Sequence, residues 1–132
     1  MEPYLHKVKY YECDAMGVAH HSNYVRFMEE ARVELMDRLG FGYERMEAEG
    51  VISPVVAISC KFQHPARFQE VVAIEVRPLS LAGLKISFAY TMRVGGTLVC
   101  EAESTHCFLE NGRPVALERR FPAFYAALSA LR

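Results

Sequence analysis

The spacing of apolar residues between positions 24 and 39 is the feature that most constrains the fold of this chain. These residues recur at i, i+3, i+4, i+7, i+11 and i+15, which places them in one stripe along an α-helix. Ser22 is a suitable N-cap for this helix, and Gly40 is a suitable residue just beyond its end. The stripe consists of Tyr24, Phe27, Met28, Ala31, Leu35 and Leu39. A long helix with a single apolar stripe needs a second layer to cover it.

The remainder of the sequence favours β-strands, which would supply that layer. Runs of β-branched residues and a strictly alternating segment predict strands at residues 5–13, 55–62, 70–79, 84–94 and 97–109. Gly95-Gly96 predicts a two-residue hairpin turn between the last two of these strands. Four consecutive strands joined by short connections form an antiparallel sheet, so the order of elements predicts an α+β fold. A sheet curled round one central helix is the hotdog architecture.

Size and composition narrow the class of protein. The chain has 132 residues, so we expect residues 1–132 to form one domain. The net charge is −1, with 15 basic and 16 acidic residues. This balance does not indicate a basic surface that would attract nucleic acid or an anionic membrane. No apolar stretch approaches the ~20 residues that span a bilayer, and the N-terminal segment lacks the apolar region of a secretory signal. Because the four cysteines form no C-x-x-C pair, we expect a cytoplasmic protein with free thiols.

The expected sheet also bears on assembly. A sheet that is covered by one helix still has free edges, and proteins usually hide such edges. Pairing two copies edge to edge would hide one edge of each copy. We therefore expect a homodimer at least, either a dimer or a dimer of dimers.

The loop before the helix carries more ionisable groups than a turn requires. Asp14, Gly17, His20, His21 and Asn23 all lie between the first expected strand and the body of the helix. Asp14 taken by itself is well explained as a turn residue. His20 and His21 could bind a metal with Asp14, but adjacent histidines in a turn point apart and no third ligand has suitable spacing. The pattern favours a site without a metal, and we expect no cofactor.

Two segments of the chain resemble one enzyme family. YYECDAMGVAHHSNYVRFMEEAR resembles the signature of the 4-hydroxybenzoyl-CoA thioesterase-like hotdog family, acyl-CoA thioesterases that include the partner of the Tol–Pal envelope system. KFQHPARFQEVVAIEV resembles the family's downstream motif, in which Pro-Ala-Arg lies between aromatic residues and precedes an acidic entry to a strand. The residues that match the first motif are Asp14, Gly17, Val18, His21, Asn23, Tyr24, Glu29, Ala31 and Arg32.

The resemblance implies an acyl-CoA thioesterase, which hydrolyses an acyl thioester to a free acid and a thiol. Asp14 would be the nucleophile or a general base toward water, and the sequence leaves this choice open. The backbone N–H of His21, at the start of the helix, would polarise the thioester carbonyl. Glu29 would orient a water molecule or the loop.

The resemblance also implies contacts to the substrate. Gly17 would let the loop backbone approach the ligand closely. Val18 and Tyr24 would contact the acyl thioester. Arg67, in the second motif, would bind a phosphate of CoA or pair with a nearby acid. A thioester of acyl carrier protein presents the same reacting group, so it remains an alternative substrate.

Two other functions are compatible with these residues. Hotdog dehydratases and hydratases pair a histidine with an acid across the dimer, and His21 with Glu29 could imitate that pair. A non-catalytic acyl-binding protein is the second alternative, although binding alone does not need the Asp14 carboxylate beside an anionic ligand. Asp14 upstream of the Gly-Val-Ala-His-His stretch fits the thioesterase pattern better.

Overall fold

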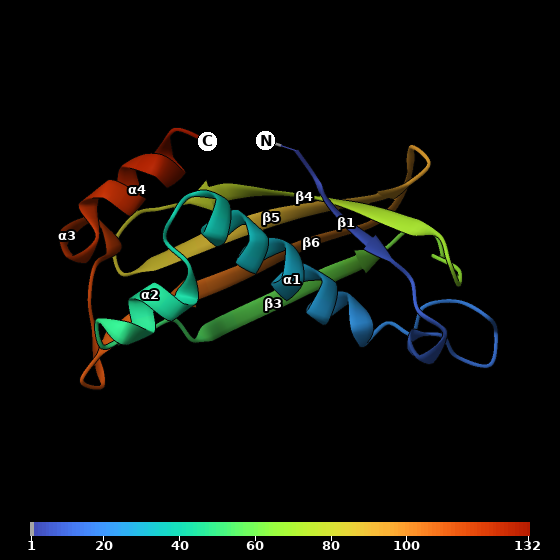
Figure 1. Cartoon of the computed structure of the whole chain (residues 1–132), viewed down its shortest axis with the longest axis horizontal. Coiled ribbons are helices and arrows are strands. Elements are labelled where there is room, and N and C mark those ends of the chain that lie inside the picture. Colours follow the sequence, from blue (N-terminus) through green and yellow to red (C-terminus); the bar gives the residue numbers. More distant parts are fainter. Residues whose placement is uncertain (1) are drawn as a thin grey trace. The chain divides into compact units, whose positions relative to one another are not determined.

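The computed structural model of the chain describes residues 2–132 and contains both strands and helices (Figure 1). The helices are the 3-10 helix η1 (Tyr10–Glu12), α1 (Asn23–Arg38), α2 (Tyr43–Ala48), α3 (Leu117–Arg120) and α4 (Pro122–Ser129). The strands are β1 (Tyr4–Lys7), β2 (Val51–Ile52), β3 (Val55–Phe62), β4 (Val71–Ser80), β5 (Lys85–Val94), β6 (Thr97–Cys107), β7 (Leu109–Glu110) and β8 (Arg113–Pro114). No helix in the described range is both long and apolar enough to cross a membrane.

Five strands form the main sheet, in the order β1-β4-β5-β6-β3. β1 pairs antiparallel with β4. β3 runs antiparallel to β6, since the Gln63 N–H donates to the Val99 carbonyl (2.9 Å) and the Cys107 N–H donates to the Pro54 carbonyl (3.3 Å). β1 and β3 are therefore the edges of the main sheet, while β2, β7 and β8 form a separate three-stranded sheet.

Helix α1 begins at Asn23 and buries the apolar stripe that its sequence predicts. The buried residues of the stripe are Tyr24, Phe27, Met28, Ala31 and Leu35. Gly40 follows the helix with a φ of 80°, a conformation that glycine adopts at low cost. The Gly40 N–H donates to the Asp37 carbonyl and the Phe41 N–H to the Met36 carbonyl, both at 3.0 Å. These two bonds form a Schellman motif, so the predicted end of the helix at Gly40 is confirmed.

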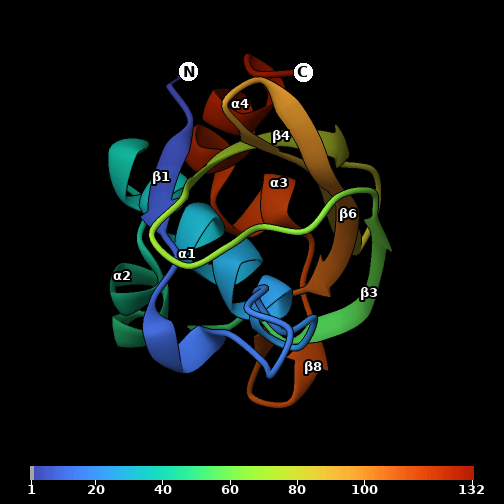
Figure 2. The same ribbon diagram turned by 90° about the vertical axis from the view of Figure 1, so that its right-hand side faces the viewer.

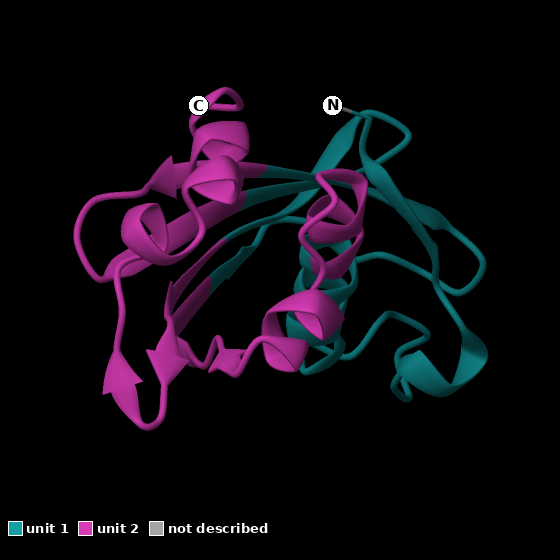
Figure 3. Cartoon of the chain, turned by 60° about the vertical axis from the view of Figure 1, so that its left-hand side comes forward, with its two compact units in different colours: residues 1–32, 60–76, 90–102 teal, residues 33–59, 77–89, 103–132 magenta. Residues whose placement is uncertain are grey.

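The chain comprises two compact units (Figure 3). Unit 1 consists of residues 1–32, 60–76 and 90–102, and unit 2 consists of residues 33–59, 77–89 and 103–132. Phe27, Tyr90 and Met92 are fully buried in unit 1. In unit 2 the ring of Phe41 stacks on that of Phe124 with centroids 5.0 Å apart. Helix α1 and strands β3, β4, β5 and β6 each contribute residues to both units.

The strand expected at residues 5–13 is wrong in its length. β1 ends at Lys7, and η1 follows because the Glu12 side chain folds back to accept the Lys9 N–H at 2.7 Å. The four later strands are confirmed as β3, β4, β5 and β6. At the turn between β5 and β6, Gly95 and Gly96 have φ values of 54° and 85°, as a two-residue hairpin turn requires. Helices α2 and α3 and strands β2, β7 and β8 are too short to leave a periodic signal, and they were not expected.

Candidate active site

The loop between η1 and α1 is closed by backbone hydrogen bonds, and it lies in front of the start of α1 in Figure 2. The Asp14 N–H donates to the Val18 carbonyl (2.9 Å), and the Gly17 N–H donates to the Asp14 carbonyl (3.0 Å). An antiparallel bridge between Cys13 and Ala19 closes the loop. Gly17 has a φ of 77°, and a Cβ at this position would meet no atom within 4 Å. The backbone conformation, rather than crowding within the chain, is what favours glycine here.

The Asp14 carboxylate is half-buried and is partly engaged in the turn. Its Oδ1 accepts the N–H of Met16 at 2.8 Å, a bond that holds the side chain in one orientation. Within residues 2–132, Oδ2 of Asp14 has no hydrogen-bond partner. One carboxylate oxygen is thus positioned by the loop while the other is available to a ligand.

The start of α1 offers a backbone donor next to this loop. The Ser22 N–H donates to Nδ1 of His20 (3.2 Å), and the Asn23 N–H donates to the His20 carbonyl (3.0 Å). The Tyr24 N–H donates to the His21 carbonyl (3.2 Å). In the described part of the chain, no acceptor is found for the N–H of His21. An unpaired N–H at a helix N-terminus, where the helix dipole is positive, is suited to an oxygen that carries negative charge.

A pocket of about 320 Å³ lies beside this helix start. It is lined by Val18, Ala19, His21, Tyr24, Phe62, Gln63, His64 and Pro65. The ring of Phe62 meets the Tyr24 ring edge-on, with centroids 5.1 Å apart, and lies 6.3 Å from the His21 ring. The structure therefore brings Val18, His21 and Tyr24 together, as expected, on a largely apolar wall of the kind that ligand pockets use.

Tyr24, which lines the pocket, and the cysteines Cys60 and Cys100 are uncharged at neutral pH. Burial raises the pKa of Tyr24, with a further contribution from the neighbouring Cys100 thiol. Burial also raises the pKa of Cys60, and burial together with Cys60 raises the pKa of Cys100 to about 12. The Cys60 thiol contacts the Met28 sulfur of α1 at 3.8 Å. The neutral Tyr24 side chain and the apolar residues of the lining therefore suit an acyl group better than a second charge.

The second motif lies against the loop. The Ala19 N–H donates to the Ala66 carbonyl (2.7 Å), and Val18 forms an antiparallel bridge with Arg67. The Arg67 N–H donates to Oε1 of Glu70 (2.6 Å), and the Arg67 side chain is exposed. Two motifs that are separated by residues 33–60 in the sequence thus meet at Val18 and Arg67.

Asp14, Gly17 and Arg67 do not line the pocket but belong to the loop and the second motif next to it, and two further residues that the sequence singled out, Glu29 and His20, also lie outside the lining. Glu29 is exposed on α1 and does not line the pocket. His20 makes local contacts, because its Nδ1 lies 2.8 Å from the Ser22 hydroxyl and its ring lies 4.1 Å from that of His21. Ser22, expected as an N-cap, directs its hydroxyl to His20.

Several residues of the site were not anticipated. Residues 62–65 line the pocket, and their position within the second motif was the available signal. His6 and Glu12 form a buried pair with Nε2 and Oε1 2.8 Å apart, directly before the loop. Glu12 is a charged residue inside a segment expected to be a strand, but nothing near it in the sequence identifies His6 as its partner.

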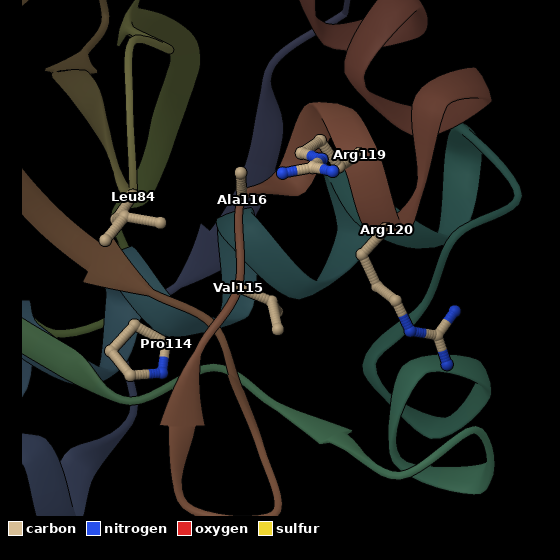
Figure 4. A pocket seen from close by; sticks show the side chains of 6 residues that line it. All are labelled: Leu84, Pro114, Val115, Ala116, Arg119 and Arg120. Atoms are coloured by element: carbon tan, nitrogen blue, oxygen red, sulfur yellow. The ribbon is translucent and has the colours of Figure 1, made fainter.

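A second pocket, of about 340 Å³, lies within unit 2 and is shown in Figure 4. It is lined by Leu84, Pro114, Val115, Ala116, Arg119 and Arg120. Arg120 donates from Nε to both carboxylate oxygens of Glu110 at 3.2 Å and from Nη2 to the Glu49 carbonyl at 3.0 Å. Hydrogen bonding to Glu110 raises the pKa of Arg120. In Figure 4 the Arg120 guanidinium is directed away from Arg119. Its bonds to Glu110 and Glu49 hold local structure in unit 2.

Comparison with known proteins shows which class of protein has this fold and site geometry. Protein TT1821 from Thermus thermophilus has 37% sequence identity and a TM-score of 0.92, with 100% of each chain covered. The DHNA-CoA thioesterase from Staphylococcus aureus has 27% identity and a TM-score of 0.91, with 98% of this chain and 89% of that chain covered. The acyl-CoA thioester hydrolase YbgC from Escherichia coli is 33% identical over 100 residues, which are 74% of this chain and 73% of YbgC.

The sheet, helix α1 and the site at its N-terminus define a hotdog protein of the thioesterase class. The thioesterase-like superfamily matches residues 8–128. The chain belongs to this superfamily. The α+β hotdog fold and the family resemblance, both expected from the sequence, are confirmed.

Proposed function

We propose that this protein hydrolyses acyl-CoA thioesters to a free acid and CoA. The observation that carries the proposal is the unpaired N–H of His21 at the start of α1, between the Asp14 loop and an apolar pocket. An acyl group that enters the pocket beside Tyr24 and Phe62 would bring its carbonyl to this donor. YbgC, a relative that is named as an acyl-CoA thioester hydrolase, supports the choice of substrate class.

The chemistry is divided between His21 and Asp14. When the thioester carbonyl is attacked, its oxygen gains negative charge, and the His21 N–H stabilises that charge by about 3–4 kcal/mol. Oδ2 of Asp14 attacks the carbonyl carbon and forms an anhydride that water then hydrolyses, or it takes a proton from the water that attacks. In both routes the C–S bond breaks and the sulfur leaves as a thiolate, which is then protonated.

Other residues support this reaction. Val18 and Tyr24 contact the acyl thioester, and the positive φ of Gly17 shapes the turn that presents Asp14. The exposed guanidinium of Arg67 binds a phosphate of CoA. Glu29, on the exposed side of α1, orients a water molecule or the loop. No cofactor is needed, because hydrolysis requires neither a redox step nor a carrier group.

Residues 1–132 form one catalytic domain in this proposal, and two copies or a dimer of dimers form the enzyme. The superfamily match over residues 8–128 supports a single domain. The exposed edge strand β3 supports the dimer. The Cys60 side chain contacts α1, and the face of β3 on which Cys60 lies also carries exposed apolar residues. These are Val56, Ile58 and Phe62. The four free cysteines support the cytoplasm as the location of the enzyme.

The test is a thiol-release assay over a panel of aromatic, short-chain and long-chain acyl-CoA thioesters, together with matching thioesters of acyl carrier protein. We expect hydrolysis of acyl-CoA, with a clear preference for one acyl class. Loss of enoyl absorbance without thiol release would identify a hydratase instead. Binding of acyl-CoA without turnover would identify an acyl-binding protein and overturn the proposal.

A further inference from the structure

We propose that His6 and Glu12 are positioning residues, whose buried pair fixes the spacing between the Asp14 carboxylate and the His21 N–H. The inference rests on the proposed thioesterase function, because it concerns the same site. Neither His6 nor Glu12 lines the pocket beside α1, so their effect on the reaction passes through the loop.

The pair is buried and closely bonded. His6 is 3% exposed and Glu12 is 4% exposed, and Nε2 of His6 lies 2.8 Å from Oε1 of Glu12. The same Oε1 accepts the Lys9 N–H at 2.7 Å, which gives the Glu12 side chain a single position. Buried ionic pairs contribute little to stability compared with apolar residues of similar volume. A role in holding a defined geometry accounts for the pair better than stability does.

The second ring nitrogen of His6 also faces a carboxylate. Nδ1 lies 3.2 Å from Oε1 of Glu30 on α1, and this oxygen accepts the Tyr4 hydroxyl at 2.7 Å. His6 thus contacts two carboxylates, one through each ring nitrogen. The ring packs on Phe27 with centroids 4.2 Å apart. Glu12 is therefore held by Nε2 of His6 and by the Lys9 N–H, while Glu30 contacts only the other nitrogen of the ring.

Glu12 transmits this restraint through its backbone. Its carbonyl accepts the His20 N–H and the side-chain Nδ2 of Asn23, both at 2.8 Å. Asp14 lies two residues after Glu12, and His21 directly follows His20. The Asp14 carboxylate and the His21 N–H are therefore each connected to Glu12 by a short stretch of backbone, one at each end of the loop. A displacement of Glu12 would shift them relative to each other.

The experiment compares Glu12→Ala, Glu12→Gln and Glu30→Ala. Glu12→Ala removes both side-chain bonds, and we expect kcat per folded molecule to fall by ~10- to 100-fold with KM within about 3-fold, since small misplacements of reacting groups are costly. Glu12→Gln keeps an acceptor for Lys9 and His6, and it should restore kcat to within about 3-fold of wild type. Glu30→Ala is the matched control, because it removes the other partner of His6 and leaves the Glu12 contacts intact. It should lower Tm and leave kcat unchanged.

Hydrogen exchange provides a readout that does not depend on activity. Exchange of residues 13–22 should be at least ~10-fold faster in Glu12→Ala and unchanged in Glu30→Ala. If Glu12→Ala does not fold, His6→Ala replaces it, with an expected loss of about 10-fold in kcat and the same change in exchange. Unchanged exchange in the loop, or equal loss of kcat in the Glu12 and Glu30 variants, would overturn the positioning role. Absence of thiol release by the wild type would overturn the proposed function. Hydrogen exchange of the loop amides would still show whether His6 and Glu12 hold the loop in place.

Discussion

Asp14 and His21 contribute to the proposed site through different parts of the residue. In the proposed reaction Asp14 would act through its carboxylate, whose Oδ1 accepts a hydrogen bond from the Met16 N–H. His21 would act through its backbone N–H, and its exposed imidazole lies near the rings of His20 and Phe62. Replacing the side chain should therefore remove the function of Asp14 and leave most of that of His21.

Asp14→Asn keeps the size of the side chain and an acceptor for Met16, but it removes the negative charge and the basicity. We expect kcat to fall by at least ~10²-fold, the low end for removal of a positioned acid–base group, with little change in KM. His21→Ala should be less damaging, because the backbone N–H remains. Thiol release by both variants on the best substrate, with circular dichroism to confirm folding, makes the comparison. A hydratase-like site predicts the reverse ranking, and a folded Asp14→Asn enzyme with most of its kcat would contradict the Asp14 mechanism.

At the scale of elements, α1, β3 and β6 meet in a cluster of weak acids whose ionisation opposes folding. The pKa of Cys100, on β6, rises from 9.0 to about 12 in the folded chain, mainly through burial. The pKa values of Tyr24 on α1 and Cys60 on β3 are raised as well. Above pH 9 the unfolded chain loses these protons more readily than the folded chain does. The contribution that these groups make to the free energy of unfolding is therefore complete below pH 9 and is lost as the pH rises toward 12.

We predict that the free energy of unfolding falls between pH 9 and 10.5, by up to about 1.4 kcal/mol per pH unit for one fully coupled group. Urea unfolding at a series of pH values measures this slope. Cys100→Ala should be less stable at pH 7 because of the cavity it leaves, but its stability should fall less steeply above pH 9. Parallel slopes for the wild type and the variant would show that Cys100 ionisation does not contribute.

Periodic elements were predictable from the sequence because every turn or pleat repeats the same signal. Ile86, Phe88 and Met92 alternate along β5 and are all buried. The segment 5–13 also alternates, but there the pattern misleads. The Glu12 side chain bonds to the Lys9 backbone and to His6, and this non-periodic contact replaces the end of the strand with η1.

The candidate site was predictable where it is contiguous in sequence. Asp14, His21 and Tyr24 fall within one motif, and the fold holds them in one loop and one helix start. The opposite wall at residues 62–65 comes from the end of β3 and the segment after it, which only the folded chain brings to the pocket. The buried His6 pair is set by tertiary contacts, so no local pattern could reveal its partner.

At the scale of the whole molecule, the edge strand β3 leaves an apolar face open. Val56, Ile58 and Phe62 are 47%, 39% and 51% exposed, and they share a strand face with Cys60, which contacts Met28 of α1. An exposed apolar edge strand is a risk for aggregation unless something covers it. A second copy of the chain, paired along β3, would cover this face in both copies.

Ile58→Lys tests the proposed dimer, because it places a charge in the middle of this face. We expect the wild type to be a dimer or a dimer of dimers by light scattering, and the variant to dissociate at concentrations at least ~10-fold higher than the wild type does, since an unpaired charge buried at an interface is costly. Ser59→Lys is the matched control: Ser59 is also exposed on β3 but lies on the opposite face of the strand, beside Lys61. It should leave assembly unchanged. Equal dissociation of both variants would place the contact elsewhere on the chain, and a stable, active wild-type monomer would contradict the dimer itself.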